Sequence, residues 1–110
     1  MRQLLFDEIR EEDVKKIKRY LHKKATPSPL GEIFWIDLPE ELYDEVQREH
    51  KDCQPFYFAA EVGRDYLRIE FLIRSRQKLH CSCIRYANKE QRAYILDFAD
   101  QLLERLKIKT

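Results

Sequence analysis

Two stretches in which apolar residues recur at every second position constrain the fold of this chain more than any other feature. In residues 56–62 the apolar side chains stand at positions 56, 58, 60 and 62, and in residues 66–75 they stand at positions 67, 69, 71 and 73. This period is typical of β-strands, because successive side chains of a strand point to opposite faces. We therefore expect two strands, each with one face in the core.

The short segment between these stretches predicts how the strands pair. Gly63 and Arg64 are typical of a two-residue hairpin turn with glycine first. Such a turn sets Ala60 opposite Leu67, Phe58 opposite Ile69 and Phe56 opposite Phe71. Every pair is apolar, so the hydrophobic pattern and the turn agree on one register.

Helical spacing predicts three helices, at about residues 11–24, 39–50 and 89–107. Val14, Ile17 and Leu21 make the apolar stripe of the first helix, which opens with acidic residues and ends with basic ones. Asn88 and Gln91 have the spacing of a capping box and mark the start of the last helix.

These segments together predict an α+β domain. The expected strands run at about residues 33–38, 56–62, 66–75 and 79–86. They form an antiparallel sheet of three to four strands, with the helices at 39–50 and 89–107 packed on one face. The length of 110 residues predicts a single domain, 1–110, in which residues 1–10 are a short helix or a loosely attached arm. The residues expected to be fully buried are Phe58, Ile69, Phe71, Phe98 and Leu102.

Composition excludes several classes of protein. Two glycines are too few for the phosphate-cradling loop of a P-loop or dinucleotide-binding protein. No apolar run approaches the roughly 18 residues that span a bilayer, and the first residues turn acidic too soon for a secretory signal. Three cysteines are an odd number, so we expect reduced thiols in a cytoplasmic protein without membrane contact.

Five residues have the chemistry of metal ligands: His50, Cys53, His80, Cys81 and Cys83. If residues 79–86 form a strand, Cys81 and Cys83 share one face with Cα atoms about 6.6–7 Å apart, which suits packing better than joint chelation of zinc. The same alternation turns His80 away from Cys81. We expect both thiols to be buried under the last helix, with no metal and no cofactor; an enzyme or metal-binding protein that uses these residues is the least favoured alternative.

Catalytic residues are not assigned. The acidic pairs of the predicted helices lie on solvated faces, where nothing moves a carboxyl pKa toward neutrality. The few serines and threonines lack the context of an activated nucleophile. The sequence therefore favours a protein that binds without catalysis.

The sheet face opposite the helices carries the candidate binding site. Its members are Tyr57, Tyr66, Arg68, Leu72 and Arg74. Tyrosine and arginine are enriched in interface hot spots, and soluble monomers seldom leave an apolar patch uncovered. We expect a small binding or self-association module that meets a protein partner or a second copy through this face. The competing interpretation is that the first helix packs its apolar stripe there.

Nucleic-acid binding is a further hypothesis. Residues 64–92 hold eight basic and three acidic residues, a net charge of +5, although the whole chain carries only +1. Basic groups interleaved with aromatics are typical of nucleic-acid surfaces. The predicted order helix, three strands, helix over residues 39–107 resembles the double-stranded RNA-binding domain, which implies an RNA partner. That family's phosphate contacts have no counterpart in this sequence, and we favour a solvated face whose arginines pair with acidic residues of the helices.

Overall fold

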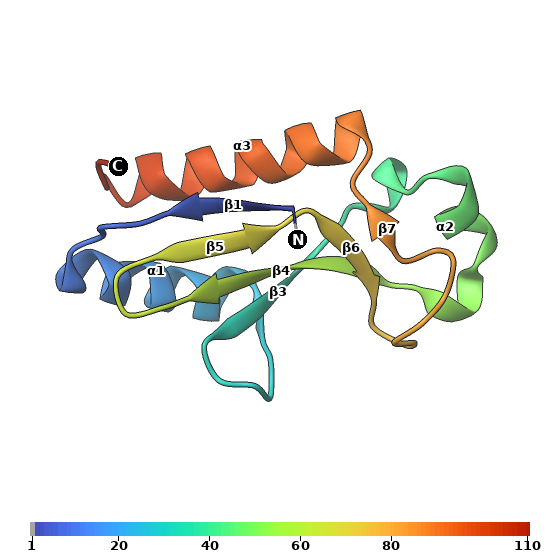
Figure 1. Cartoon of the computed structure of the whole chain (residues 1–110), viewed down its shortest axis with the longest axis horizontal. Helices are drawn as coiled ribbons and strands as arrows, with labels where there is room; N and C mark the ends of the chain where they lie inside the picture. The colour runs from blue at the N-terminus through green and yellow to red at the C-terminus, as the bar shows by residue number, and fades with distance from the viewer. Residues whose placement is uncertain (1) are drawn as a thin grey trace.

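An antiparallel sheet backed by two long helices gives the chain the α+β architecture predicted from its sequence (Figure 1). The computed structural model describes residues 2–110. The sheet has the strand order β1-β5-β4-β3-β2, while β6 also pairs with β4 and β7 pairs with β6. Its seven strands, more than the three to four expected, are β1 (Gln3–Phe6), β2 (Thr26–Pro27), β3 (Ile33–Asp37), β4 (Phe56–Val62), β5 (Leu67–Glu70), β6 (Leu72–Ser75) and β7 (Arg85–Tyr86).

The segment before the first long helix belongs to the sheet. Residues 3–6, which the sequence leaves open between a helix and an arm, form β1 and pair with β5. Leu4 lies opposite Ile69 and Phe6 opposite Leu67, so β1 extends the apolar inner face of the sheet by one strand.

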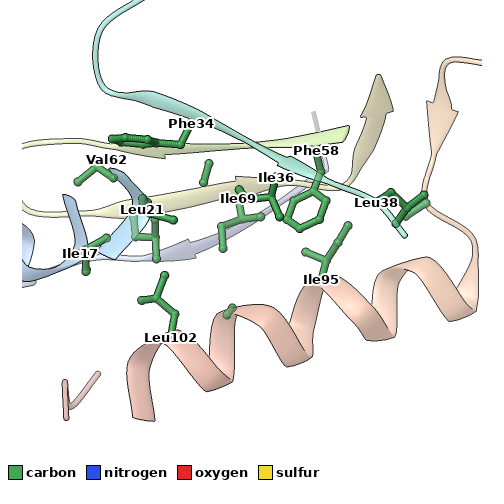
Figure 2. Packing of buried hydrophobic residues seen from close by; sticks show 14 of the residues in the cluster. Ile17, Leu21, Phe34, Ile36, Leu38, Phe58, Val62, Ile69, Ile95 and Leu102 are labelled. Atoms are coloured by element: carbon green, nitrogen blue, oxygen red, sulfur yellow. The ribbon is translucent and has the colours of Figure 1, made fainter. Parts of the chain in front are cut away.

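The two long helices share one face of the sheet. Helix α1 (Glu11–Lys24) and helix α3 (Lys89–Arg105) send their apolar stripes into one buried cluster with inward side chains of β3, β4 and β5. Figure 2 shows Ile17 and Leu21 of α1 and Ile95 and Leu102 of α3 between the sheet and α3. The prediction that the last two helices cover this face is therefore wrong: α1 takes the place given to the second helix. Within residues 2–110, no helix is long and apolar enough to cross a membrane.

The segment predicted as one helix over 39–50 is instead three short pieces. A 3₁₀ turn (Glu40–Leu42) is followed by the five-residue helix α2 (Glu45–Glu49) and a second 3₁₀ turn (Lys51–Cys53). Tyr43 is extended and breaks the first piece from the second, and Asp44 then restarts the helix with a capping box. These pieces lie beyond the end of the sheet beside β7, not on its face (Figure 1).

The β4–β5 hairpin keeps the predicted faces but not the predicted register. Its loop is Gly63–Tyr66, closed by the Gly63 N–H donating to the Tyr66 carbonyl, and this loop sets Val62 opposite Leu67. Ala60 consequently faces Ile69 and not Leu67. The shift of two residues leaves every inner side chain on the inner face, because the side-chain period of a strand is two. The pattern therefore identified the buried face although the turn was misread.

The second stretch of the hairpin is broken at Phe71. Strand β5 ends at Glu70 and β6 begins at Leu72, and past the break Phe56 pairs with Ser75 and not with Phe71. The register moves by two residues, as at a β-bulge, where extra residues on one strand leave the ladder. Phe71 itself is only partly buried.

Most of the strand predicted over 79–86 is a loop. Only Arg85 and Tyr86 pair, as β7, and the Ile84 N–H donates to the Cys81 carbonyl to close a turn. The helix, three strands, helix order that resembled the double-stranded RNA-binding domain is therefore not what this chain forms.

Two buried glutamines join the start of α2 to the start of α3. Asn88 and Gln91 form the predicted capping box, and Asp44 and Gln47 form a second one. Gln91 Nε2 donates to Gln47 Oε1 over 3.0 Å, and Gln47 Nε2 donates to the Cys83 carbonyl over 3.3 Å. Both side chains are almost completely buried, so each amide depends on these partners for its hydrogen bonds.

We expect truncation of two aromatic residues, Phe58 and Phe71, to lower the stability of the protein by different amounts. Phe58 is fully buried and meets Phe98 edge-on with ring centroids 5.7 Å apart, whereas Phe71 is only partly buried. Phe58→Ala should lower the free energy of unfolding by about 3–5 kcal/mol, and Phe71→Ala should cost clearly less. Denaturant titration of both variants measures the difference, and equal losses would contradict the break at Phe71.

The glutamine pair predicts a polar contribution to stability. Gln91→Ala removes one capping-box partner and leaves Gln47 Oε1 without the Gln91 amide, so it should cost about 1–3 kcal/mol. Gln101→Ala, at an exposed position of the same helix, is the matched control and should change stability by less than about 0.5 kcal/mol. Equal unfolding midpoints for the two variants would show that the buried network contributes nothing.

Candidate functional site

The predicted binding residues lie on the outer face of the sheet or on the loop at its end. Tyr57, Arg68 and Arg74 project outward from β4, β5 and β6, because their strand neighbours project into the core. Leu72 pairs with Tyr86 of β7, and Tyr66 lies in the hairpin loop beside Arg68. Neither α1 nor α3 covers this face, since both pack on the other side.

Every outward arginine of the central strands is bound to a carboxylate of the same face. Arg68 of β5 forms an ion pair with Glu61, the residue opposite it on β4. Arg74 pairs with Glu70 at 3.0 Å, and this hydrogen bond raises the pKa of the Arg74 guanidinium. Both partners are acids of the sheet, so the expectation that these arginines pair with acidic residues of the helices is wrong.

An aromatic stack marks the middle of the outer face. The rings of Trp35 and Tyr57 lie 4.7 Å apart, and the Arg76 guanidinium lies over both, 5.3 Å and 5.6 Å from their centroids. Arg76 also pairs with Asp37 at 2.8 Å. This packing leaves Tyr57 buried, with 8% of its surface exposed. Arg76 is absent from the predicted site, because the sequence places it in a loop and not on the sheet.

A second candidate site consists of the three thiols. The Sγ atoms of Cys53, Cys81 and Cys83 all lie within 4.8 Å of one another, and Cys53 Sγ is 3.8 Å from Cys81 Sγ. All three are free thiols; Cys53 and Cys83 are buried, whereas Cys81 is partly exposed. The expectation that Cys81 and Cys83 are both buried on a strand is wrong, because they occupy a turn, and in a turn their side chains converge.

Buried side chains hold the backbone that carries these thiols. The Ser75 hydroxyl donates to the Cys53 carbonyl and accepts from the backbone N–H groups of Gln77 and Lys78. The Gln47 amide donates to the Cys83 carbonyl. Both segments of the cluster are thus tied to the fold through side chains that the sequence analysis did not select.

The thiols differ in acidity. A hydrogen bond from the Cys83 backbone N–H lowers the pKa of Cys81 to about 7, and His50 shifts it in the same direction. Burial raises the pKa of Cys83, and the neighbouring sulfurs add to this increase. Cys81, the most exposed thiol, is therefore more easily ionised than Cys83.

The two histidines near the cysteines have different surroundings. His50 is partly buried, and its Nδ1 lies 2.6 Å from the Val46 carbonyl oxygen. His80, next to Cys81 in sequence, is exposed. Three thiols with a neighbouring imidazole can bind a thiophilic metal ion or react as nucleophiles.

The difference in acidity predicts selective labelling of Cys81. In chelator-treated protein, iodoacetamide should modify Cys81 first, with a rate that rises with pH and is half-maximal near pH 7, because only the thiolate reacts. Cys53 and Cys83 should react only after denaturant is added, since both are buried. Peptide mass spectrometry assigns the modified residue, and equal rates at all three thiols would refute this order.

Comparisons of the chain with protein-family models, with curated proteins and with solved structures found no match in any of the three. The function has to be argued from the two sites themselves. Of these, the outer face is the larger surface, and the thiol cluster is the denser group of reactive side chains.

Proposed function

We propose that this domain is a non-enzymatic association module that binds a second copy of itself through the outer face of its sheet. The observation that carries the proposal is the one-sided packing of the helices, which leaves the outer face without a covering helix. Trp35, Tyr57, Arg68 and Arg74 on that face are of the residue types that dominate interface hot spots.

The charge of the face favours a protein partner over a nucleic acid. Arg68, Arg74 and Arg76 are each bound to an acidic residue, so these pairs leave the face close to neutral. Nucleic-acid surfaces instead present unpaired basic groups to the phosphates. The three arginines that residues 64–92 contribute to the centre of this face are therefore each neutralised by an acidic neighbour.

The alternation of charges favours a second copy as that partner. Acidic and basic side chains lie side by side across β4, β5 and β6. When two such faces stack about a two-fold axis that lies in the plane of the interface, basic groups of one protomer can meet acidic groups of the other, which makes the surface complementary to itself. The stack of Trp35 and Tyr57, with the Arg76 guanidinium over both rings, lies at the centre of this surface.

The proposal is tested by reversing the charge of two basic residues of the outer face. Arg68→Glu combined with Arg74→Glu should convert a wild-type dimer into a monomer, as measured by size-exclusion chromatography with light scattering over a range of concentrations. The melting temperature should change little, because half-exposed ion pairs contribute only about 0.2–1 kcal/mol each. Arg92→Glu, at an exposed position of α3, is the control and should leave the dimer intact.

A compensated variant separates loss of the interface from damage to the fold. Adding Glu61→Arg and Glu70→Arg to the double variant restores both ion pairs within the chain with their signs exchanged. This fourfold variant should associate with itself again. A wild-type chain that stays monomeric at all concentrations would refute the proposal, as would salt-dependent binding of single-stranded RNA that the double variant loses.

A further inference from the structure

The spacing of the three sulfur atoms is that of ligands around one metal ion. In a tetrahedral zinc site with Zn–S bonds near 2.3 Å, two sulfurs lie about 3.8 Å apart. Cys53 Sγ and Cys81 Sγ are 3.8 Å apart, and Cys83 Sγ lies within 4.8 Å of both. A disulfide needs its sulfurs about 2.05 Å apart and would leave the third thiol unpaired. The geometry therefore fits shared coordination better than oxidation.

The backbone around the cluster is fixed before any ligand binds. The side chains of Ser75 and Gln47 hold the carbonyl groups of Cys53 and Cys83, and the Cys83 N–H hydrogen-bonds to the Cys81 sulfur. Hydrogen bonds that orient the ligands and donate to thiolate sulfur are typical of protein metal sites. Three thiols from segments 28 residues apart are thus held together by contacts within the fold itself.

We propose that Cys53, Cys81 and Cys83 bind one Zn²⁺ ion as thiolates, with the fourth position open to solvent on the side of the partly exposed Cys81. Zinc is the ion that combines tetrahedral geometry with thiolate ligands. The four cysteines of an ordinary iron–sulfur cluster are not present in a chain with three. The site lies beside α2 and does not depend on the proposed self-association.

Metal content of the native chain is the first test. Protein purified with reductant and without chelator, then equilibrated with zinc and desalted, should hold one zinc ion per chain by atomic emission. A mercurial that titrates the thiols should release this zinc in step with thiol modification. Zinc well below one equivalent would overturn the proposal, and so would zinc released without modification of the thiols or a disulfide between any two cysteines.

Cobalt substitution then identifies the ligands. The Co²⁺-loaded wild-type chain should show the visible bands of a tetrahedral ion and the near-ultraviolet band of sulfur-to-metal charge transfer. Cys81→Ser, which alters the most exposed ligand, should weaken the charge-transfer band and lower the zinc affinity at least tenfold. A Cys81→Ser variant that binds zinc as tightly as the wild type would overturn the assignment, and circular dichroism confirms that the variant is folded.

Discussion

The hydrogen bond between Gln47 and Gln91 is the interaction on which the arrangement of the peripheral elements depends. A helix of five residues such as α2 has too few internal hydrogen bonds to persist alone. Its first turn is fixed by the Gln47 side chain. The Gln47 amide oxygen accepts hydrogen bonds from the Asp44 backbone N–H and the Gln91 side chain, and the Gln47 amide nitrogen donates one to the Cys83 carbonyl. One buried amide therefore sets the position of α2, the start of α3 and the loop that holds two of the three thiols.

The sheet, by contrast, is ordered by its two unlike faces. The inner face receives both α1 and α3, so it contains nearly all the fully buried aliphatic and aromatic side chains of the strands. The outer face carries ion pairs between neighbouring strands, whose charged groups remain partly exposed to water. Its aromatic rings are covered by an arginine and not by a helix. A partner that binds there meets ordered, pre-paired charges.

The sequence predicted the elements that local patterns determine. Helices α1 and α3, strands β3 and β4 and the buried face of the hairpin follow from periods of 3.6 and two, and the Asn88 capping box follows from its spacing. The loop length at Gly63 was misread because a two-residue and a four-residue turn expose the same inner face. The break at Phe71 depends on backbone bonds to Arg2 and Ala87, far away in sequence. The outer-face residues were therefore foreseen from alternation, whereas the thiol cluster was not. Local alternation made residues 79–86 a strand, but Cys81 begins a turn that the Ile84 N–H closes, and contacts with the distant residues Gln47 and Cys53 place this turn.

Strand β5 has a consequence for the order in which the native contacts form. Its neighbours are β1, more than sixty residues earlier, and β4, only a short loop away. The β4–β5 hairpin closes a small loop at little entropic cost, whereas docking β1 closes a loop that includes α1 and half of the sheet. Contacts between residues far apart in the sequence form slowly, whereas contacts between near neighbours form quickly. We therefore expect the hairpin to form early and β1 to join late. Until β1 docks, the free edge of β5 is a strand edge that another chain can pair with, and the kinetics of folding decide how long that edge stays open.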